Sequence, residues 1–312
     1  MQSSVFLHKL LKLKVDRSKG APAPHKAILL LSIFQLMEEG EILENEIPIT
    51  PQLVAKFKDN WHELVIDNRF TPNFALPFYH LGSSKFWFLK TYPGKEVVLT
   101  SSASISSLSA LRQTVVHACF DDAVFHLLRD PYFRHQAMQV LLSNYFNGRQ
   151  LVTNGYSMLE AVEDSILHEA PVVYQQAIKT ADEEEIFVRG GVFKKVVPKI
   201  YNYTCCISGL KITSTRDMQM IDACHIVPFA ESFDDTIKNG LSLSPNLHRA
   251  FDRFLITINR QYEVIVSDQF TESGNHSIKA FHGKKIQLPT DTSYHPSMEN
   301  IKWHFEKFMR LH

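Results

Sequence analysis

The chain has few cysteines, no apolar run long enough for a membrane and no excess of charge of either sign. Four cysteines stand among 312 residues, and their spacing fits neither a disulfide framework nor a zinc site. The apolar run at residues 27–37 is too short to cross a bilayer, and the lysine-rich N-terminus lacks the pattern of a signal peptide. These absences predict a cytoplasmic protein without a membrane span.

The balanced charge excludes a protein that coats DNA through a uniformly basic surface. Thirty-three lysines and arginines stand against 33 aspartates and glutamates, so the formal net charge is zero. A local excess remains in residues 1–26, where Asp16 is the single acid beside several lysines. Such a segment suits a phosphate backbone, and it is equally typical of a helix with solvated lysines and a buried apolar face.

The composition supports more than one packed core. Hydrophobic residues make up 45% of the chain, with 22 phenylalanines, and the length suggests about two domains. We expect an α+β protein with a mainly helical N-terminal domain at 1–165, a linker at 166–185 and a second domain at 186–312. The acidic residues 182–185 mark that linker or the exposed opening of the next helix. The amphipathic residues 296–310 are expected to pack on the second domain or to form a dimer seam.

Apolar spacing predicts the smaller elements of the N-terminal domain. Short strands are expected around residues 85–89 and 96–100, and helices over residues 111–128, 131–146 and 156–169.

The most informative stretch is residues 222–252. Residues 221–227 have the composition of a short strand, Asn239-Gly240 is a turn dipeptide, and residues 241–243 alternate like a returning strand. A Ser-Pro pair then starts a helix whose apolar residues recur through 246–256. The order predicted here is strand, strand, helix.

On that helix His248 and Asp252 are four residues apart, so both side chains project from one face and can share a cation. His225 lies on the facing strand. The pattern resembles the HNH endonucleases, or ββα-metal nucleases, with His225, Asn239 and His248 on the three signature letters. The resemblance extends upstream, where residues 193–197 and 201–210 look like that family's lead helix and first strand.

Hydrolysis of a phosphodiester needs a deprotonated water and a cation that neutralises the charge developing on the phosphate. The resemblance makes His225 the general base, His248 a metal ligand and Asp252 a second ligand. The carboxylate favours Mg²⁺ or Mn²⁺, while the imidazole shifts the preference toward Mn²⁺ or another transition metal.

Three further residues in this part of the chain receive roles, Asn239 by resemblance and the two arginines from their charge. Asn239 would fasten the loop so that His225 keeps its orientation. Arg249 and Arg253 would hold the DNA phosphates as charged donors.

Two departures from the family pattern concern metals. Many relatives have a metal-binding aspartate or histidine before the first histidine, but here that residue is Cys224. The first metal ligand is therefore either Cys224, whose thiolate suits Zn²⁺, or Asp222 on the same strand face; Asp222 is preferred. The two Cys-x-x-Cys pairs of many relatives are absent at 206–209 and 244–247, so no zinc ribbon is expected.

The N-terminal half carries a second resemblance. Residues 24–31, 73–81 and 86–89 are similar to the sulfur-binding domain of McrA-like type IV restriction enzymes, which join it to a C-terminal HNH domain. Such domains recognise phosphorothioate DNA, in which sulfur replaces one non-bridging phosphate oxygen.

Sulfur is larger and more weakly hydrated than oxygen, so an apolar pocket with a cation at its rim favours it. Pro77 and Phe78 would form the wall of this pocket. His25 and Lys26, at the start of an apolar helix, would supply charge and donors, and Arg69 would reach a base edge or a neighbouring phosphate.

The sequence thus suggests a modification-dependent restriction endonuclease that binds phosphorothioate-modified double-stranded DNA and cuts nearby with a metal-dependent HNH site. A cut through both strands suggests a homodimer. In one alternative, the N-terminal domain reads a modified base or a short unmodified sequence. In another, the protein is a DNA-binding regulator whose HNH fold is inactive.

Overall fold

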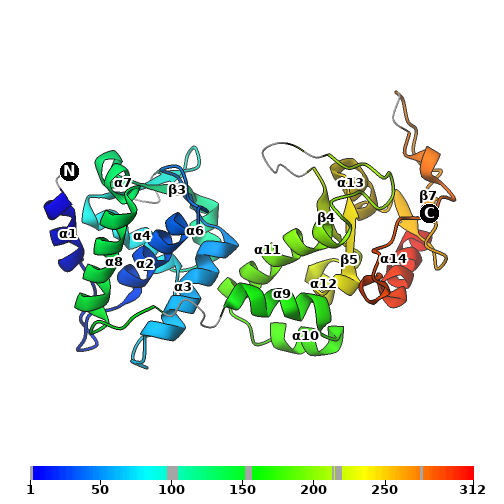
Figure 1. The fold of residues 1–312 in the computed structure, drawn as a ribbon. Coiled ribbons are helices and arrows are strands. Elements are labelled where there is room, and N and C mark those ends of the chain that lie inside the picture. Colours follow the sequence, from blue (N-terminus) through cyan, green and yellow to red (C-terminus); the bar gives the residue numbers. More distant parts are fainter. Residues whose placement is uncertain (1–2, 97–104, 152–156, 213, 215–219, 275–276) are drawn as a thin grey trace. The chain divides into compact units, whose positions relative to one another are not determined.

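The computed structural model describes residues 3–96, 105–151, 157–212, 214, 220–274 and 277–312. The chain divides into two compact units (Figure 1), of which the N-terminal unit holds residues 1–159 and 182–188 and the C-terminal unit holds residues 160–181 and 189–312.

The N-terminal unit is built around a helix that is apolar on nearly every side. This helix, α2 (His25–Glu38), packs against α3 (Pro51–Leu64), α4 (Ala75–His80) and α8 (Pro131–Tyr145). A helix without a polar face can be stable only when other elements enclose it. It therefore forms the core of the unit, and α1 (Ser3–Leu11) covers α8 at the edge.

A small antiparallel sheet completes this unit, with the order β1 (Ile47–Pro48), β3 (Val115–Phe120), β2 (Trp87–Thr91). The strand expected around 85–89 is confirmed as β2, while residues 97–100 of the second expected strand lie outside the described residues.

The prediction of one helix over residues 111–128 is wrong. The segment contains the end of α6 (Leu108–Thr114), then β3, then α7 (Asp122–Leu128). Two adjacent valines begin β3, and pairing with strands on both sides outweighs the apolar spacing that suggested a helix. The helices expected at 131–146 and 156–169 are confirmed as α8 and α9 (Met158–His168).

Helix α11 (Glu183–Ile200) opens on the acidic tract. Glu184, expected at an exposed opening, is buried, and its Oε1 accepts a hydrogen bond from the backbone N–H of Phe74 at 2.6 Å. Glu183 accepts from the N–H of Leu108, which begins α6. These carboxylates satisfy donors at the starts of two helices of the N-terminal unit.

Part of the segment assigned to a linker is regular structure. Residues 166–185 include α10 (Pro171–Ile178), whose Tyr174 is fully buried, and they lie in the C-terminal unit as far as residue 181. The domain bounds 1–165 and 186–312 stay a prediction.

The centre of the C-terminal unit is the hairpin of β4 (Asp222–His225) and β5 (Gly240–Leu243), followed by α13 (Pro245–Asp252). The predicted strand, strand, helix order is confirmed. The connection between the strands is longer than a two-residue turn, since α12 (Phe229–Ser232) and a short 3₁₀ helix, η2 (Ile237–Asn239), lie within it.

Gly240 is needed for close packing rather than for a turn. It is extended, in β5, and a Cβ built on it would lie 2.8 Å from a methyl carbon of Val197 on α11. Any side chain here would push the hairpin away from α11.

No strand forms at residues 201–210, contrary to expectation. The chain folds there into tight turns, with the N–H of Gly209 bonded to the carbonyl of Cys205 at 2.9 Å. The N–H of Cys206 donates to the carbonyl of Ser242 at 2.7 Å, so the turn is fixed to β5.

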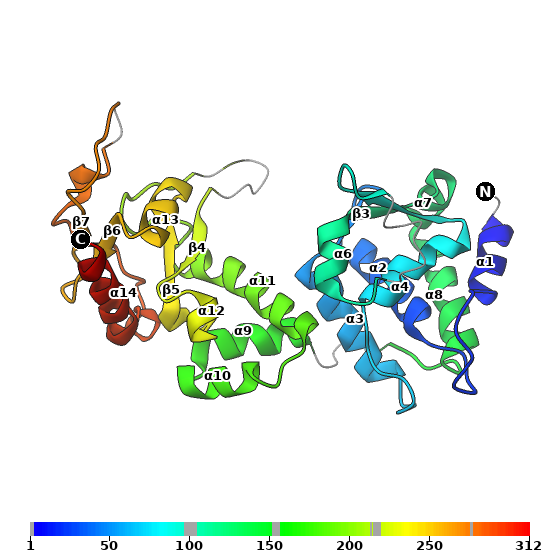
Figure 2. The same ribbon diagram turned by 180° about the vertical axis from the view of Figure 1, so that it is seen from behind.

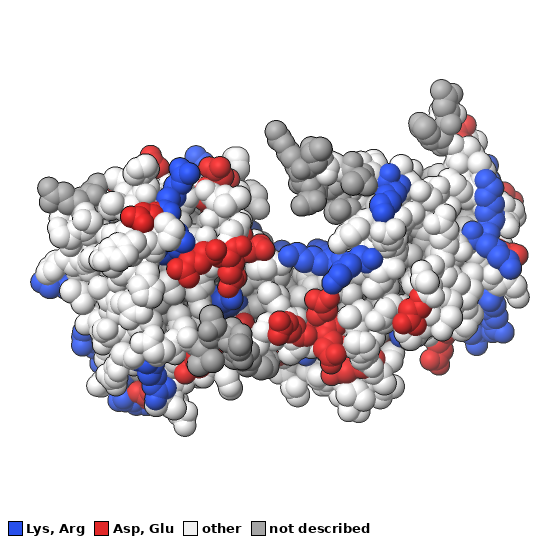
Figure 3. All heavy atoms as spheres, viewed as in Figure 1, with Lys and Arg blue, Asp and Glu red and all other residues white. Residues whose placement is uncertain are grey.

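The C-terminal helix α14 (Met298–Leu311) packs on β6 (Ile256–Ile258), which pairs with β7 (Val264–Val266) (Figure 2). Its apolar side chains Ile301 and Phe308 are buried there, so the expected packing on the second domain is confirmed. Among the described residues, no helix is both long and apolar enough to span a membrane. The face shown in Figure 3 carries basic and acidic side chains over both units, in keeping with the balanced composition.

Candidate functional site

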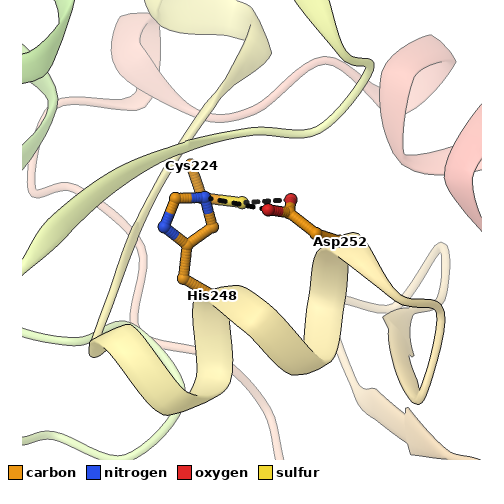
Figure 4. A group of neighbouring side chains, drawn as sticks. All are labelled: Cys224, His248 and Asp252. Atoms are coloured by element: carbon orange, nitrogen blue, oxygen red, sulfur yellow. Dashed lines mark hydrogen bonds and ion pairs between the residues drawn. The ribbon is translucent and has the colours of Figure 1, made fainter. Parts of the chain in front are cut away.

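Three side chains of the types that bind metals converge between β4 and α13. Cys224 comes from β4, and His248 and Asp252 rise from one face of α13 (Figure 4). One ligand atom from each lies within 4.8 Å of the others. The Nε2 of His248 is 3.4 Å from Asp252 Oδ2, and Cys224 Sγ is 3.9 Å from Asp252 Oδ1. A sulfur, a nitrogen and an oxygen donor together suit a divalent transition metal ion.

Cys224 is fully buried, and this burial, with the carboxylate of Asp252 beside it, raises the pKa of the thiol well above its usual value. A bound divalent cation reverses that preference, because its positive charge stabilises the thiolate.

Asp222 occupies a different place from the one expected. Its Oδ2 lies 3.1 Å from Nδ1 of His248, on the ring nitrogen opposite the one that faces Asp252. A carboxylate in this position holds the proton on Nδ1 and leaves Nε2 free as a ligand. The geometry therefore brings Cys224 rather than Asp222 into the group of three.

His225 is the last residue of β4, and it lies near His248 and Asp252. Its ring stacks on Phe193 of α11, with centroids 4.1 Å apart and planes 6° from parallel. Its Nε2 lies 2.7 Å from Oδ1 of Asp235. A cavity of about 250 Å³ is lined by His225 together with His248 and Asp252. His225, expected to activate water, thus shares one cavity with His248 and Asp252, two of the three expected metal ligands.

Asn239 is fully buried and fastens the loop between the strands. Its Oδ1 accepts from the N–H of Val227 at 2.8 Å, and its Nδ2 donates to the carbonyls of Val227 and Asp234 at 2.8 and 2.9 Å. These three bonds tie Val227, the second residue after β4, to the loop that returns to β5. This geometry agrees with the fastening role expected from the sequence.

Alanine at position 239 should lower the free energy of unfolding by about 2–4 kcal/mol, because the buried N–H and carbonyl groups lose their partners. Urea unfolding followed by circular dichroism measures the change. Gln261→Ala, at an exposed position between β6 and β7, is the control, and it should change the free energy of unfolding by less than about 0.5 kcal/mol. Equal effects of the two changes would contradict the fastening role of Asn239.

Arg249 and Arg253 are exposed, beside His248 and Asp252 in the chain. Nothing in their positions tests the phosphate-binding role, which stays a prediction.

The N-terminal unit contains a larger cavity, of about 610 Å³. Its walls combine apolar side chains, among them Leu76 and Pro77, with the cationic groups of Lys14, Lys19 and Lys26. His25 also lines it. The expected neighbours His25, Lys26 and Pro77 are therefore brought together around one space.

Each of the two units contains a stretch that matches the model of a known protein family. Residues 205–259 match the HNH endonuclease model HNH_2, and residues 3–154 match the model of a ScoMcrA-like DNA sulfur-binding domain. The chain carries a DNA sulfur-binding domain and an HNH endonuclease domain. Both assignments made from the sequence are confirmed.

Two solved structures are similar to parts of the chain. A modification-dependent TagI restriction endonuclease is 18% identical over 37% of this chain and 36% of its own, with a TM-score of 0.28. The type IV phosphorothioation-dependent restriction endonuclease ScoMcrA is 10% identical over 78% of this chain and 83% of its own, with a TM-score of 0.34. The present chain thus spans 36% of the length of the first of these proteins. The comparison with curated proteins gives no match.

Lys26 places a cation inside the cavity of the sulfur-binding domain. Its side chain is buried, and Nζ donates to the carbonyl of Lys14 at 2.7 Å and to Ser83 Oγ at 3.1 Å. Burial, and then the charge of Lys14, lowers the pKa of Lys26 to about 8. The ammonium group is therefore mostly charged at neutral pH, and an anion in the cavity would stabilise its charge further.

His25 stands at the first position of α2, beside Lys26. Its Nε2 lies 2.9 Å from the carbonyl oxygen of Thr71, and its ring meets Trp61 edge to face at 4.6 Å. Burial lowers the pKa of His25, so the ring is neutral at pH 7. The donation to Thr71 then uses the Nε2 proton.

Phe78, expected in the wall of this pocket, lies elsewhere. It is fully buried in the core, where it packs on Phe74 and Trp87, and its ring does not line the cavity. Arg69 is exposed and its guanidinium binds Asp67; its expected contact with a base edge or a neighbouring phosphate stays a prediction. Pro77 and Phe78 are adjacent in α4, where successive side chains point about 100° apart; Pro77 lines the cavity beside Leu76, while Phe78 points into the core.

Sequence reasoning missed Asp235 and Phe193 as neighbours of His225. Phe193 belongs to the fragment that resembles a lead helix, but no spacing rule connects it with a residue more than 30 positions away. Asp235 is one of two adjacent aspartates in a loop, which by itself is typical of a solvated turn.

Proposed function

We propose that the protein is a modification-dependent restriction endonuclease. Its sulfur-binding domain would hold a phosphorothioate linkage, and its HNH domain would hydrolyse a phosphodiester bond of the same DNA. The observation that carries this proposal is the shared cavity of His225, His248 and Asp252 in a chain that also has a sulfur-binding domain.

The chemistry would follow from the side chains around the small cavity. Cys224, His248 and Asp252 would hold a divalent cation, and Asp222 would keep the ring of His248 in the tautomer that binds through Nε2. The cation, when bound, supplies positive charge that stabilises the attacked phosphate and the departing 3′ oxygen. His225 would accept the proton of the attacking water, as a neutral imidazole can at cellular pH.

The larger cavity would select the modified linkage. The apolar walls at Leu76 and Pro77 tolerate a weakly hydrated sulfur, while an ordinary phosphate oxygen would lose hydrogen bonds to water on entering. Lys26 would balance the negative charge that both linkages carry.

A cut through both strands needs two nuclease centres, and the described residues contribute one group of Cys, His and Asp that fits a metal ion. We therefore propose that two copies of the chain act together on one duplex.

The deciding experiment compares two duplexes of identical sequence, one with a single phosphorothioate and one without. The modified duplex should be cut in the presence of Mn²⁺, the ordinary duplex should be cut at least about tenfold more slowly, and EDTA should stop both reactions. Adding back Mg²⁺, Mn²⁺ or Zn²⁺ separately identifies the metal that the Cys-His-Asp group uses.

The other outcomes are equally informative. Equal cleavage of both duplexes would mean that the N-terminal domain reads something other than sulfur. Selective binding without cleavage under any of the metals would mean that the protein is a DNA-binding regulator. Cleavage that is indifferent to EDTA would contradict a metal-dependent centre.

A further inference from the structure

Asp235 is a buried carboxylate that directly contacts His225. It lies in the loop between α12 and η2, only 2% exposed, with its Oδ1 2.7 Å from Nε2 of His225. A buried carboxylate is stable only when its oxygens have partners, so this contact is part of what holds Asp235 in place.

The second oxygen of Asp235 also has a partner. The hydroxyl of Tyr174, on α10, donates to Oδ2 at 3.5 Å. Burial, and then the nearby carboxylate, raises the pKa of Tyr174, so its hydroxyl keeps the proton that it donates. The guanidinium of Arg189 lies 5.0 Å from the centre of the Tyr174 ring. Asp235 therefore has a hydrogen-bond partner at each of its two oxygens.

Its neighbour Asp234 is equally buried but has a different role. Asp234 accepts from the backbone N–H of Thr236 at 2.8 Å, which shapes the loop itself. The two partners of Asp235 are side chains, His225 and Tyr174. The sequence thus places two adjacent carboxylates in one loop, one that binds the backbone and one that binds the imidazole.

We propose that Asp235 is the positioning residue for His225, which it holds with the proton on Nε2 and with Nδ1 as the nitrogen that accepts the proton of water. This inference rests on the proposed function, in which His225 is the base. A carboxylate can only accept, so the hydrogen of a neutral imidazole at this contact belongs to Nε2. Stacking on Phe193 holds the plane of the ring, and the contact of Nε2 with Asp235 fixes which way round the ring sits.

The proton balance of the step is simple. Water transfers one proton to Nδ1, and the ring, which keeps its Nε2 proton, becomes an imidazolium. The positive charge then lies next to the carboxylate of Asp235 in a site largely shielded from water. Such pairing assists the transfer in the same way as the aspartate that orients a histidine in the serine hydrolases.

Asp235→Asn tests the proposal, because asparagine keeps the size of the side chain but offers an amide that can turn either its oxygen or its NH₂ group to the ring. We expect kcat for phosphorothioate DNA to fall by about 10²–10⁴-fold, with KM and the Kd for the same DNA within about threefold of wild type. Asp234→Asn is the matched control, and its kcat should stay within about tenfold of wild type. An Asp235→Asn variant that folds and keeps its kcat would overturn the proposal.

A spectroscopic measurement separates this inference from the proposed function. In full-length protein labelled with ¹⁵N-histidine, long-range ¹H–¹⁵N correlation shows which ring nitrogen carries the proton, and His225→Gln identifies the signals. The wild-type spectrum at pH 8 should place the proton on Nε2, and Asp235→Asn should give a mixture of tautomers or mostly the Nδ1 form. A wild-type ring protonated on Nδ1, or an unchanged tautomer in Asp235→Asn, would overturn the inference even if the protein cuts no DNA.

Discussion

A protein with alanine at position 225 should bind phosphorothioate DNA with wild-type affinity and leave it uncut. Removing a general base costs about 10²–10⁴-fold in rate, because water must then lose its proton without a positioned acceptor. His225 lies outside the group formed by Cys224, His248 and Asp252, so the cation site should persist. The expected result is a selective loss of kcat, measured by single-turnover cleavage beside equilibrium binding to the same duplex.

Alanine also removes one of the two side-chain partners of buried Asp235, which costs about 1–3 kcal/mol of stability. A second variant, His225→Gln, addresses that effect, since its amide NH₂ can still donate to Asp235 but cannot serve as a base near neutral pH. Both variants should lose cleavage to a similar extent, whereas alanine should be the less stable of the two in urea.

His168→Ala is the matched control for the loss of a histidine that pairs with a carboxylate. His168 lies 3.0 Å from Asp164, is exposed, and is not among the residues that line the nuclease cavity. Its replacement should leave cleavage within about twofold of wild type. Cleavage by His225→Ala or His225→Gln at a rate close to that of His168→Ala would remove His225 from the role of base.

The nuclease motif could be predicted because its signals are local. The spacing of His248 and Asp252 places both on one face of a helix wherever that helix lies, and the short strands around it have clear composition. The choice between Asp222 and Cys224 is not local. Both lie on one face of β4, and only the approach of α13 decides that Cys224 faces Asp252 while Asp222 meets the other nitrogen of His248.

The elements that were predicted wrongly depend on distant partners. β3 is a strand because β1 and β2 pair with it from either side, and neither neighbour can be identified from the six residues of β3 themselves. The turns at 201–210 are fixed to β5 through Cys206 and Ser242. The pairing of Asp235 with His225 likewise depends on how the long connection between β4 and β5 folds back.

The second large effect is expected at the sulfur-binding cavity, where Pro77→Asp should abolish the preference for phosphorothioate over ordinary DNA. Burying a phosphate oxygen without compensating hydrogen bonds costs about 1–3 kcal/mol, which corresponds to a preference of roughly 5- to 150-fold for the weakly hydrated sulfur. A carboxylate at 77 brings water and negative charge into the cavity. The affinity for both duplexes should fall, and the ratio of the two Kd values should approach one.

Pro77 is the third residue of α4 and lies buried at the cavity wall, so an aspartate there is expected to cost some stability. An aspartate in the first turn of a helix interacts favourably with the helix dipole, and proline contributes no N–H bond that could be lost. The unfolding transition of the variant in urea checks that its sulfur-binding domain is intact.

Two further variants separate the chemistry of the wall from the change of charge. Pro77→Ala keeps the wall apolar and should retain most of the sulfur preference. Pro93→Asp introduces the same charge at an exposed position that does not line the cavity, and its ratio of Kd values should equal that of wild type. Fluorescence anisotropy with the paired duplexes at fixed salt measures each ratio, because phosphate contacts make the absolute affinities salt-dependent. If Pro77→Asp and Pro93→Asp gave the same ratio as wild type, the sulfur would have to be recognised outside this cavity.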